Sequence, residues 1–99
     1  MGHPNLSVFT KVIVNEPQIS PAQVRAARAW LGWSRSDLSA KSGISPGAIA
    51  LYEKGRSIPY DATLLKLRRA FEVAGLRFHF DGMLAAGISR NLARRVEER

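Results

Sequence analysis

The sequence predicts a small, mainly α-helical domain, a bundle of four to five helices with short flanking β-strands. Its 99 residues, 45% of them hydrophobic, are enough for one core but not for two. Four segments place a serine or an aspartate directly before an apolar pattern of helical spacing, which is how helices usually begin. Two other segments, 7–14 and 76–80, have the composition or the alternation of β-strands.

The chain opens with an arm, residues 1–20, in which β-branched side chains favour a strand over Ser7–Val14. Ser20 and Pro21 then start a helix, because serine caps a first turn and proline is tolerated at its first position. Gly32 ends this helix. Its buried stripe is expected to comprise Val24, Ala27, Leu31 and Trp30, and Trp33 follows as a second core tryptophan.

Ser34–Gly55 carries the most informative pattern, two short helices joined by a tight turn. The first runs over 35–42 behind the cap Ser34, and Gly43 makes the turn. The second is capped by Ser45, with Pro46 at its first position. This layout is typical of a DNA-binding helix-turn-helix, whose second helix lies in the major groove. The side chains spaced to face one shared core are Leu38, Ile44, Ile49 and Tyr52.

The rest of the chain predicts a long helix, a strand and a tail. Asp61 is expected to cap a helix over 62–74, which Gly75 ends in a left-handed conformation. The alternation over 76–80 predicts a strand that closes a helix-turn-helix domain spanning 21–82. The tail, 83–99, is basic and has few apolar residues. It forms either a short helix over 89–97 or no fixed structure.

Charge and composition limit the classes of partner that the chain is expected to bind. The formal net charge is +7 and the isoelectric point about 10.9, which favours polyanions, nucleic acid before acidic membranes. Residues 21–60 carry six basic and two acidic side chains, so the charge is richest over the helix-turn-helix. The absence of cysteine fits a reducing compartment, and we expect a cytoplasmic protein. Neither a signal peptide nor a membrane span is indicated.

No pattern indicates an enzyme, a metal site or a cofactor. The histidines, His3 and His79, are far apart and have no second ligand at metal spacing. The serines lack a His/Asp arrangement, and the glycines form no phosphate-binding loop.

Residues 21–75 resemble the Cro/CI-like (Xre-type) helix-turn-helix domain of phage repressors and bacterial regulators. The resemblance implies a lambda-repressor-like bundle in a bacterial, nucleoid-associated regulator. Such a protein binds double-stranded promoter or operator DNA as a homodimer and acts as a repressor or an activator. The motifs that carry it are VRAARAWLGWSRSDLS, SGISPGAIALYEKGRSIP and TLLKLRRAFEVAGLRF.

The resemblance also implies roles for single residues. Arg35 stands where the family usually has a Gln that contacts DNA, and it can reach a phosphate. Glu53 matches a structural glutamate whose natural basic partner here is Arg28. Lys54 and Arg56 lie where the family contacts phosphates.

The base-reading positions depart from the family, because they hold Pro46, Gly47, Ala50 and Leu51. None of these side chains can make the bidentate hydrogen bonds that separate guanine from adenine, and Ser45 offers a single bond. Three interpretations stay open. Specificity comes from thymine-methyl contacts and DNA shape; or from other cations, including a tail with Arg90, Arg94 and Arg95; or the face binds a protein.

Dimerisation is expected through the two strand segments, which pair either within one subunit or across a two-fold axis. The dimer residues are expected to be Leu76, Phe78 and Phe80. The alternative function is an antitoxin or anti-activator-like module whose main partner is another, regulatory protein.

Overall fold

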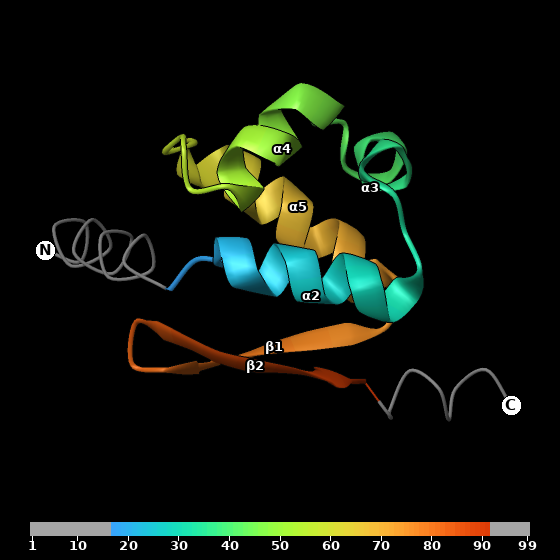
Figure 1. The fold of residues 1–99 in the computed structure, drawn as a ribbon. Coiled ribbons are helices and arrows are strands. Elements are labelled where there is room, and N and C mark those ends of the chain that lie inside the picture. Colours follow the sequence, from blue (N-terminus) through green and yellow to red (C-terminus); the bar gives the residue numbers. More distant parts are fainter. Residues whose placement is uncertain (1–16, 92–99) are drawn as a thin grey trace, which may run out of the picture.

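The computed structural model describes residues 17–91, which form four helices followed by a β-hairpin (Figure 1). This mainly helical architecture confirms the predicted fold class. The strand expected over 7–14 lies outside the described residues, and so does the tail from residue 92 onward. The elements are α2 (Pro21–Leu31), α3 (Arg35–Ser42), α4 (Pro46–Glu53), α5 (Asp61–Val73), β1 (Leu76–Asp81) and β2 (Leu84–Arg90).

Three serine caps set where the first three of these helices begin. The Ser20 hydroxyl accepts a hydrogen bond from the Gln23 backbone N–H at 3.1 Å, and the Gln23 side chain accepts one from the Ser20 N–H at 3.0 Å. Ser34 and Asp37 form the same reciprocal pair at the start of α3. Ser45 caps α4 by accepting from the N–H of Ala48. These caps satisfy backbone donors that a first turn leaves unpaired, and they confirm the predicted starts.

The start of α5 differs from the prediction. Asp61 is the first helical residue and Tyr60 occupies the cap position, where the described residues provide no side-chain hydrogen bond. The Asp61 carboxylate instead lies in the first turn, where negative charge is favourable to the helix dipole. Gly75, after the last turn, has a φ of 101°, as predicted for a left-handed residue.

The core gathers apolar side chains from every element around Phe71, which is fully buried. The Trp33 ring stacks on Phe71 with centroids 5.6 Å apart, and the Phe78 ring meets it edge-on at 5.8 Å. Trp33 is therefore a core residue, as predicted. Trp30 is not, because 48% of its surface is exposed and it lines a groove between α2 and β2.

β1 pairs with β2, so residues 84–90 belong to the domain and not to a tail. The predicted helix from Ser89 is absent over residues 89–91. The antiparallel register slips by one residue between His79 and Phe80, which leaves Ala86 as the extra residue of a bulge. A Leu-Ala-Ala-Gly start has weak strand propensity, which explains why the sequence did not predict this strand.

Gln23 holds the hairpin against α2. Its side chain is buried, and its Nε2 donates to the backbone carbonyls of His79 and Gly87, each at 3.1 Å. One amide group thus bridges both strands beside the bulge, while its oxygen completes the helix cap. Such full pairing offsets the cost of burying a polar group.

The elements form layers that separate the hairpin from α4. β2 packs under α2 and β1 packs under α5, while α3 and α4 lie on the other side of these helices (Figure 1). Among the described residues, no helix has the length and apolarity needed to cross a bilayer.

Candidate nucleic-acid interface

The inner face of α4 is anchored in the core. Leu38 on α3 and Ile49 on α4 are fully buried, and the turn between the two helices has Gly43 at a φ of 79°. The Tyr52 hydroxyl donates to the backbone carbonyl of Ile19 at 2.6 Å, and burial raises the pKa of this hydroxyl. α4 therefore has a fixed orientation, and its opposite face is available for contact.

The exposed face of α4 is apolar, as the sequence predicted. Pro46, Gly47, Ala48 and Leu51 are all exposed, and Leu51 retains 49% of its accessible surface. Ala50 is only partly exposed, so Ala48, which the sequence analysis did not single out, takes a larger share of this face. The Ser45 hydroxyl at the start of the face already accepts a hydrogen bond from the helix.

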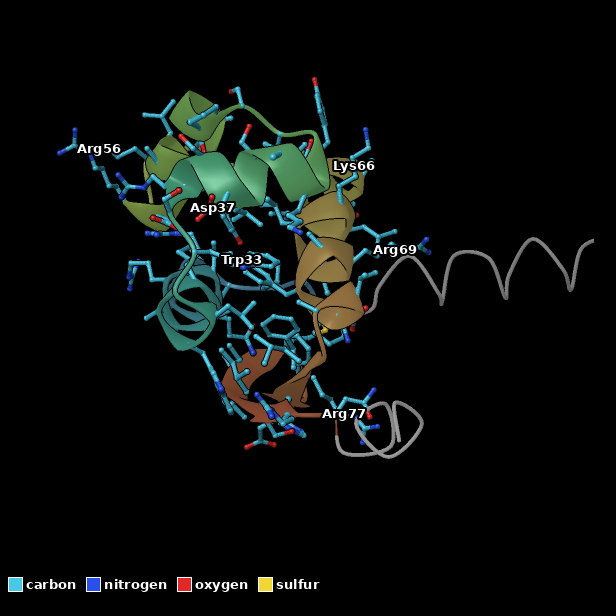
Figure 2. All side chains as sticks on the ribbon, turned by 90° about the vertical axis from the view of Figure 1, so that its right-hand side faces the viewer. Trp33, Asp37, Arg56, Lys66, Arg69 and Arg77 are labelled. Atoms are coloured by element: carbon cyan, nitrogen blue, oxygen red, sulfur yellow. The ribbon has the colours of Figure 1, made fainter. Side chains whose placement is uncertain are left out.

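Cations lie at the C-terminal end of this apolar face. Lys54 and Arg56 follow α4 directly and are exposed. Figure 2 shows Arg56 extending outward from the part of the molecule that carries α4. Arg35 stands at the first position of α3, and 39% of its side chain is exposed.

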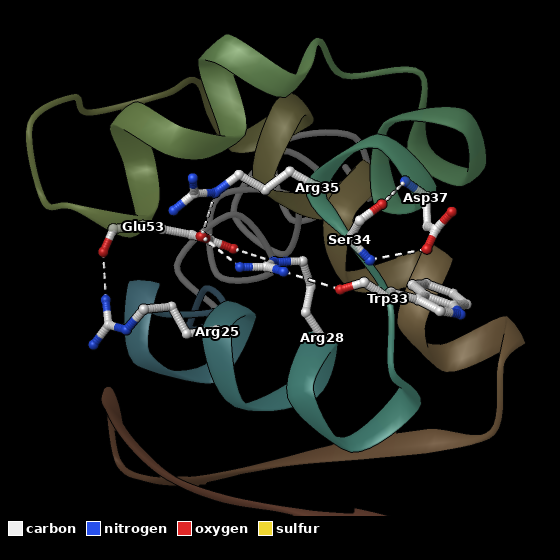
Figure 3. A network of polar contacts seen from close by, with 7 residues as sticks. All are labelled: Arg25, Arg28, Trp33, Ser34, Arg35, Asp37 and Glu53. Carbon is white, nitrogen blue, oxygen red and sulfur yellow. Dashed lines mark hydrogen bonds and ion pairs between the residues drawn. The ribbon is translucent and has the colours of Figure 1, made fainter.

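Glu53, the last residue of α4, is the centre of a charged network (Figure 3). Its carboxylate is buried and accepts from Arg28 Nε at 2.6 Å, from Arg28 Nη2 at 3.0 Å and from Arg35 Nε at 2.9 Å. Arg28 also donates to the Trp33 carbonyl at 2.9 Å, and Arg25 donates to the Glu53 carbonyl. The structure thus contains the predicted Arg28–Glu53 pair and adds two arginines that the sequence did not assign to it.

Electrostatics keeps this network charged. Burial acts to raise the pKa of the Glu53 carboxyl, but the hydrogen bonds and charges of Arg28 and Arg35 outweigh it and hold that pKa below its ordinary value. The same hydrogen bond raises the pKa of Arg28 against the effect of desolvation. The end of α4 is therefore tied to α2 and to the start of α3 by fixed charges.

The sequence comparison settles the family. The helix-turn-helix family model HTH_3 matches residues 24–76, more than half of the chain. The chain belongs to this Cro/CI-type (Xre-like) helix-turn-helix family. Membership implies DNA binding and indicates no catalytic family. No curated protein matches the chain.

In this helix-turn-helix protein Arg35 has a structural contact that the resemblance did not include. Its Nε is committed to Glu53, while the terminal nitrogens belong to a side chain that is partly exposed. A guanidinium has five N–H donors, so the ion pair leaves others for a second contact.

The helix-turn-helix domain uses the expected dimer residues in its own core. Leu76 and Phe78 are only 2% and 4% exposed, and Phe80 packs against the same core under the guanidinium of Arg68. Strand alternation predicted their shared face correctly, but α2 and α5 cover that face. Their burial leaves little of them to contact a second subunit.

Arg90, expected in a basic tail, is the last residue of β2. The hairpin that contains β2 lies on the side of the domain opposite α4 (Figure 1). Arg94 and Arg95 are outside the described residues. Among residues 17–91, no group of three or more acidic, His or Cys side chains is placed to hold a metal ion.

Proposed function

We propose that this protein is a transcriptional regulator that binds promoter or operator DNA through α4, as a homodimer. The observation that carries the proposal is the exposed face of α4, bordered by cations and held rigidly by the Glu53 network. Phosphate contacts fix the register of a protein on DNA, and base contacts select the sequence. The cations suit the first task and the α4 face suits the second.

Arg35, Lys54 and Arg56 are the proposed phosphate-binding side chains. Arg35 pairs with Glu53, the last residue of α4, and Lys54 and Arg56 follow that residue in the chain, so the three cations lie at the C-terminal end of the exposed helix face. The backbone N–H of Arg56 donates to the Leu51 carbonyl at 2.9 Å, which fixes the main chain from which this exposed side chain extends.

The homodimer is supported by the hairpin. The described residues form a sheet of two strands, β1 and β2. Within these residues no third strand pairs with the outer edge of β2. Antiparallel pairing of two β2 edges generates a two-fold axis perpendicular to the sheet. Both helical layers then lie on one side of the four-stranded sheet, and both α4 helices face the same way, as a palindromic site requires.

Binding-site selection from random DNA, with the mass of the complex measured, tests the function. We expect a palindromic consensus whose half-sites lie about one helical turn apart, bound by two chains. If the protein showed no preference for its own promoter over random DNA at moderate salt, operator binding would be excluded.

The apolar surface beside α4 supports a second candidate, a module whose main partner is another protein, as in antitoxins or anti-activators. Ile58 is 99% exposed and Tyr60 86% exposed, both in the loop that follows α4. Large exposed apolar side chains are common in protein interfaces. Tight binding to the product of an adjacent gene, weakened by Ile58→Asp, in a protein without selective DNA binding would favour this candidate.

A further inference from the structure

We propose that α4 selects DNA through the C5-methyl groups of thymine, with Leu51 as the main contact and hydrogen bonds to base edges playing little part. This inference rests on the proposed function, because it describes how the same helix face would choose its site.

The chemistry of the α4 face leads to this conclusion by elimination. The exposed side chains of Pro46, Ala48 and Leu51 have no hydrogen-bond donor or acceptor, and Gly47 has no side chain. The hydroxyl of Ser45 is already engaged with the N–H of Ala48 at 3.2 Å. In the major groove, the thymine methyl is the apolar group that a base pair presents. An apolar face gains from that methyl, but it desolvates the polar edges of other bases without replacing their hydrogen bonds.

Leu51 is the side chain on this face with the longest reach. It is half exposed, and together with Ala48, Ile58 and Tyr60 it lines a groove between α4 and the loop that follows. The C5-methyl of thymine is small enough to pack against a leucine that is supported from one side in this way. A single buried methyl group contributes about a fourfold gain in affinity.

The neighbouring charges favour DNA over an apolar protein surface. The Leu51 carbonyl accepts from the Arg56 backbone N–H, and Gly55, at a φ of 71°, turns the chain between them. Leu51, the proposed apolar contact, and Arg56, the neighbouring cation, are thus held close together in the chain by this backbone hydrogen bond. A surface that presents methyl groups close to regularly spaced negative charges, as the major groove does, complements this pairing.

Replacement of thymine by deoxyuridine tests the proposal, because it removes the methyl and leaves base pairing unchanged. The probe is the DNA site obtained by selection, with its thymines replaced one at a time. Affinity is measured by fluorescence anisotropy for the wild type, Leu51→Ala and Arg56→Ala. We expect a loss of about fourfold for the wild type at each contacted thymine. We expect 5-methylcytosine to substitute at such a position with a smaller loss than cytosine.

The two variants separate the roles. In Leu51→Ala the deoxyuridine penalty should disappear at the position that Leu51 contacts, whereas in Arg56→Ala overall affinity should fall and the penalty should remain. Circular dichroism checks that both variants fold, which the exposure of both side chains favours. Equal wild-type affinity for thymine and deoxyuridine sites, or an unchanged penalty in Leu51→Ala, would overturn methyl recognition and leave the proposed function intact. Failure to bind any thymine-containing site selectively would overturn the proposed function itself.

Discussion

At the residue scale, Glu53 ties the end of α4 to α2 and to the start of α3. Its buried carboxylate faces two guanidinium groups, so Glu53→Gln would leave Arg28 and Arg35 without their counter-charge. We expect the free energy of unfolding to fall by about 2 kcal/mol, below the range for fully buried pairs because both arginines are partly exposed. Urea denaturation measures it.

The matched control for Glu53 is Glu72→Gln. Glu72 pairs with Arg68 one turn away on α5, at 2.9 Å, and its side chain is 40% exposed. Exposed pairs of this spacing contribute only about 0.3–0.5 kcal/mol. If both substitutions cost the same, Glu53 would have no special role in holding α4.

The pH dependence of stability follows from the same carboxylate. The pKa of Glu53 lies below its ordinary 4.5 in the folded chain, so the unfolded state takes up a proton first as the pH falls. The contribution of Glu53 is thus fully present above about pH 5 and is lost as the pH falls through its folded pKa. We expect wild-type stability to fall more steeply than that of Glu53→Gln as the pH falls below about 5. Parallel curves would contradict the lowered pKa.

At the scale of elements, the helices and β1 were predictable from the sequence, and β2 was not. Caps are local signals, so Ser20, Ser34 and Ser45 marked their helices correctly from the sequence alone. β2 depends instead on pairing with β1 and on the amide of Gln23, both of which are contacts distant in sequence. For the same reason the sequence related Glu53 to Arg28 only through the family resemblance and did not assign Arg35 to it.

Gln23→Glu tests how the hairpin is held. The carboxylate can still accept from the Ser20 N–H, but it cannot donate to the carbonyls of His79 and Gly87. We expect a loss of about 2 kcal/mol at pH 7, because two partly buried carbonyls lose their donor beside a new charge. Hydrogen exchange should accelerate most in β1 and β2. Ser20→Ala is the control, since it removes the cap and leaves the hairpin bonds. Equal acceleration in both variants would contradict this role of Gln23.

At the scale of the whole molecule, β2 carries so little charge that the β2 strands of two copies can pair edge to edge. Over Leu84–Arg90 only Arg90 is charged, although the chain as a whole carries +7. In an antiparallel pair centred on Gly87, each Arg90 lies opposite Leu84 of the other copy and not opposite another arginine. Charged side chains usually protect an exposed edge strand from pairing with another chain. β2 has only one such side chain, Arg90.

Lysines on this edge should therefore separate the proposed dimer. We expect Leu84→Lys combined with Ala86→Lys to give a monomer by light scattering while its circular dichroism is unchanged, since both side chains are exposed. Val73→Lys places the same charge on an exposed apolar position of α5 and should leave the dimer intact. A dimeric double variant would mean that the interface lies elsewhere.

The salt dependence of DNA binding reports how many copies of the protein contact phosphates at one DNA site. Each phosphate contact contributes about −0.9 to the slope of log K against log salt concentration. In a dimer Arg56→Ala removes two contacts, so the slope should become shallower by about 1.8, against about 0.9 for a single copy. Arg77→Ala is the control, because Arg77 lies on the hairpin at the opposite end of the molecule from Arg56 (Figure 2). A change of about 0.9 would mean that only one subunit uses Arg56. An unchanged slope would remove Arg56 from the phosphate contacts altogether.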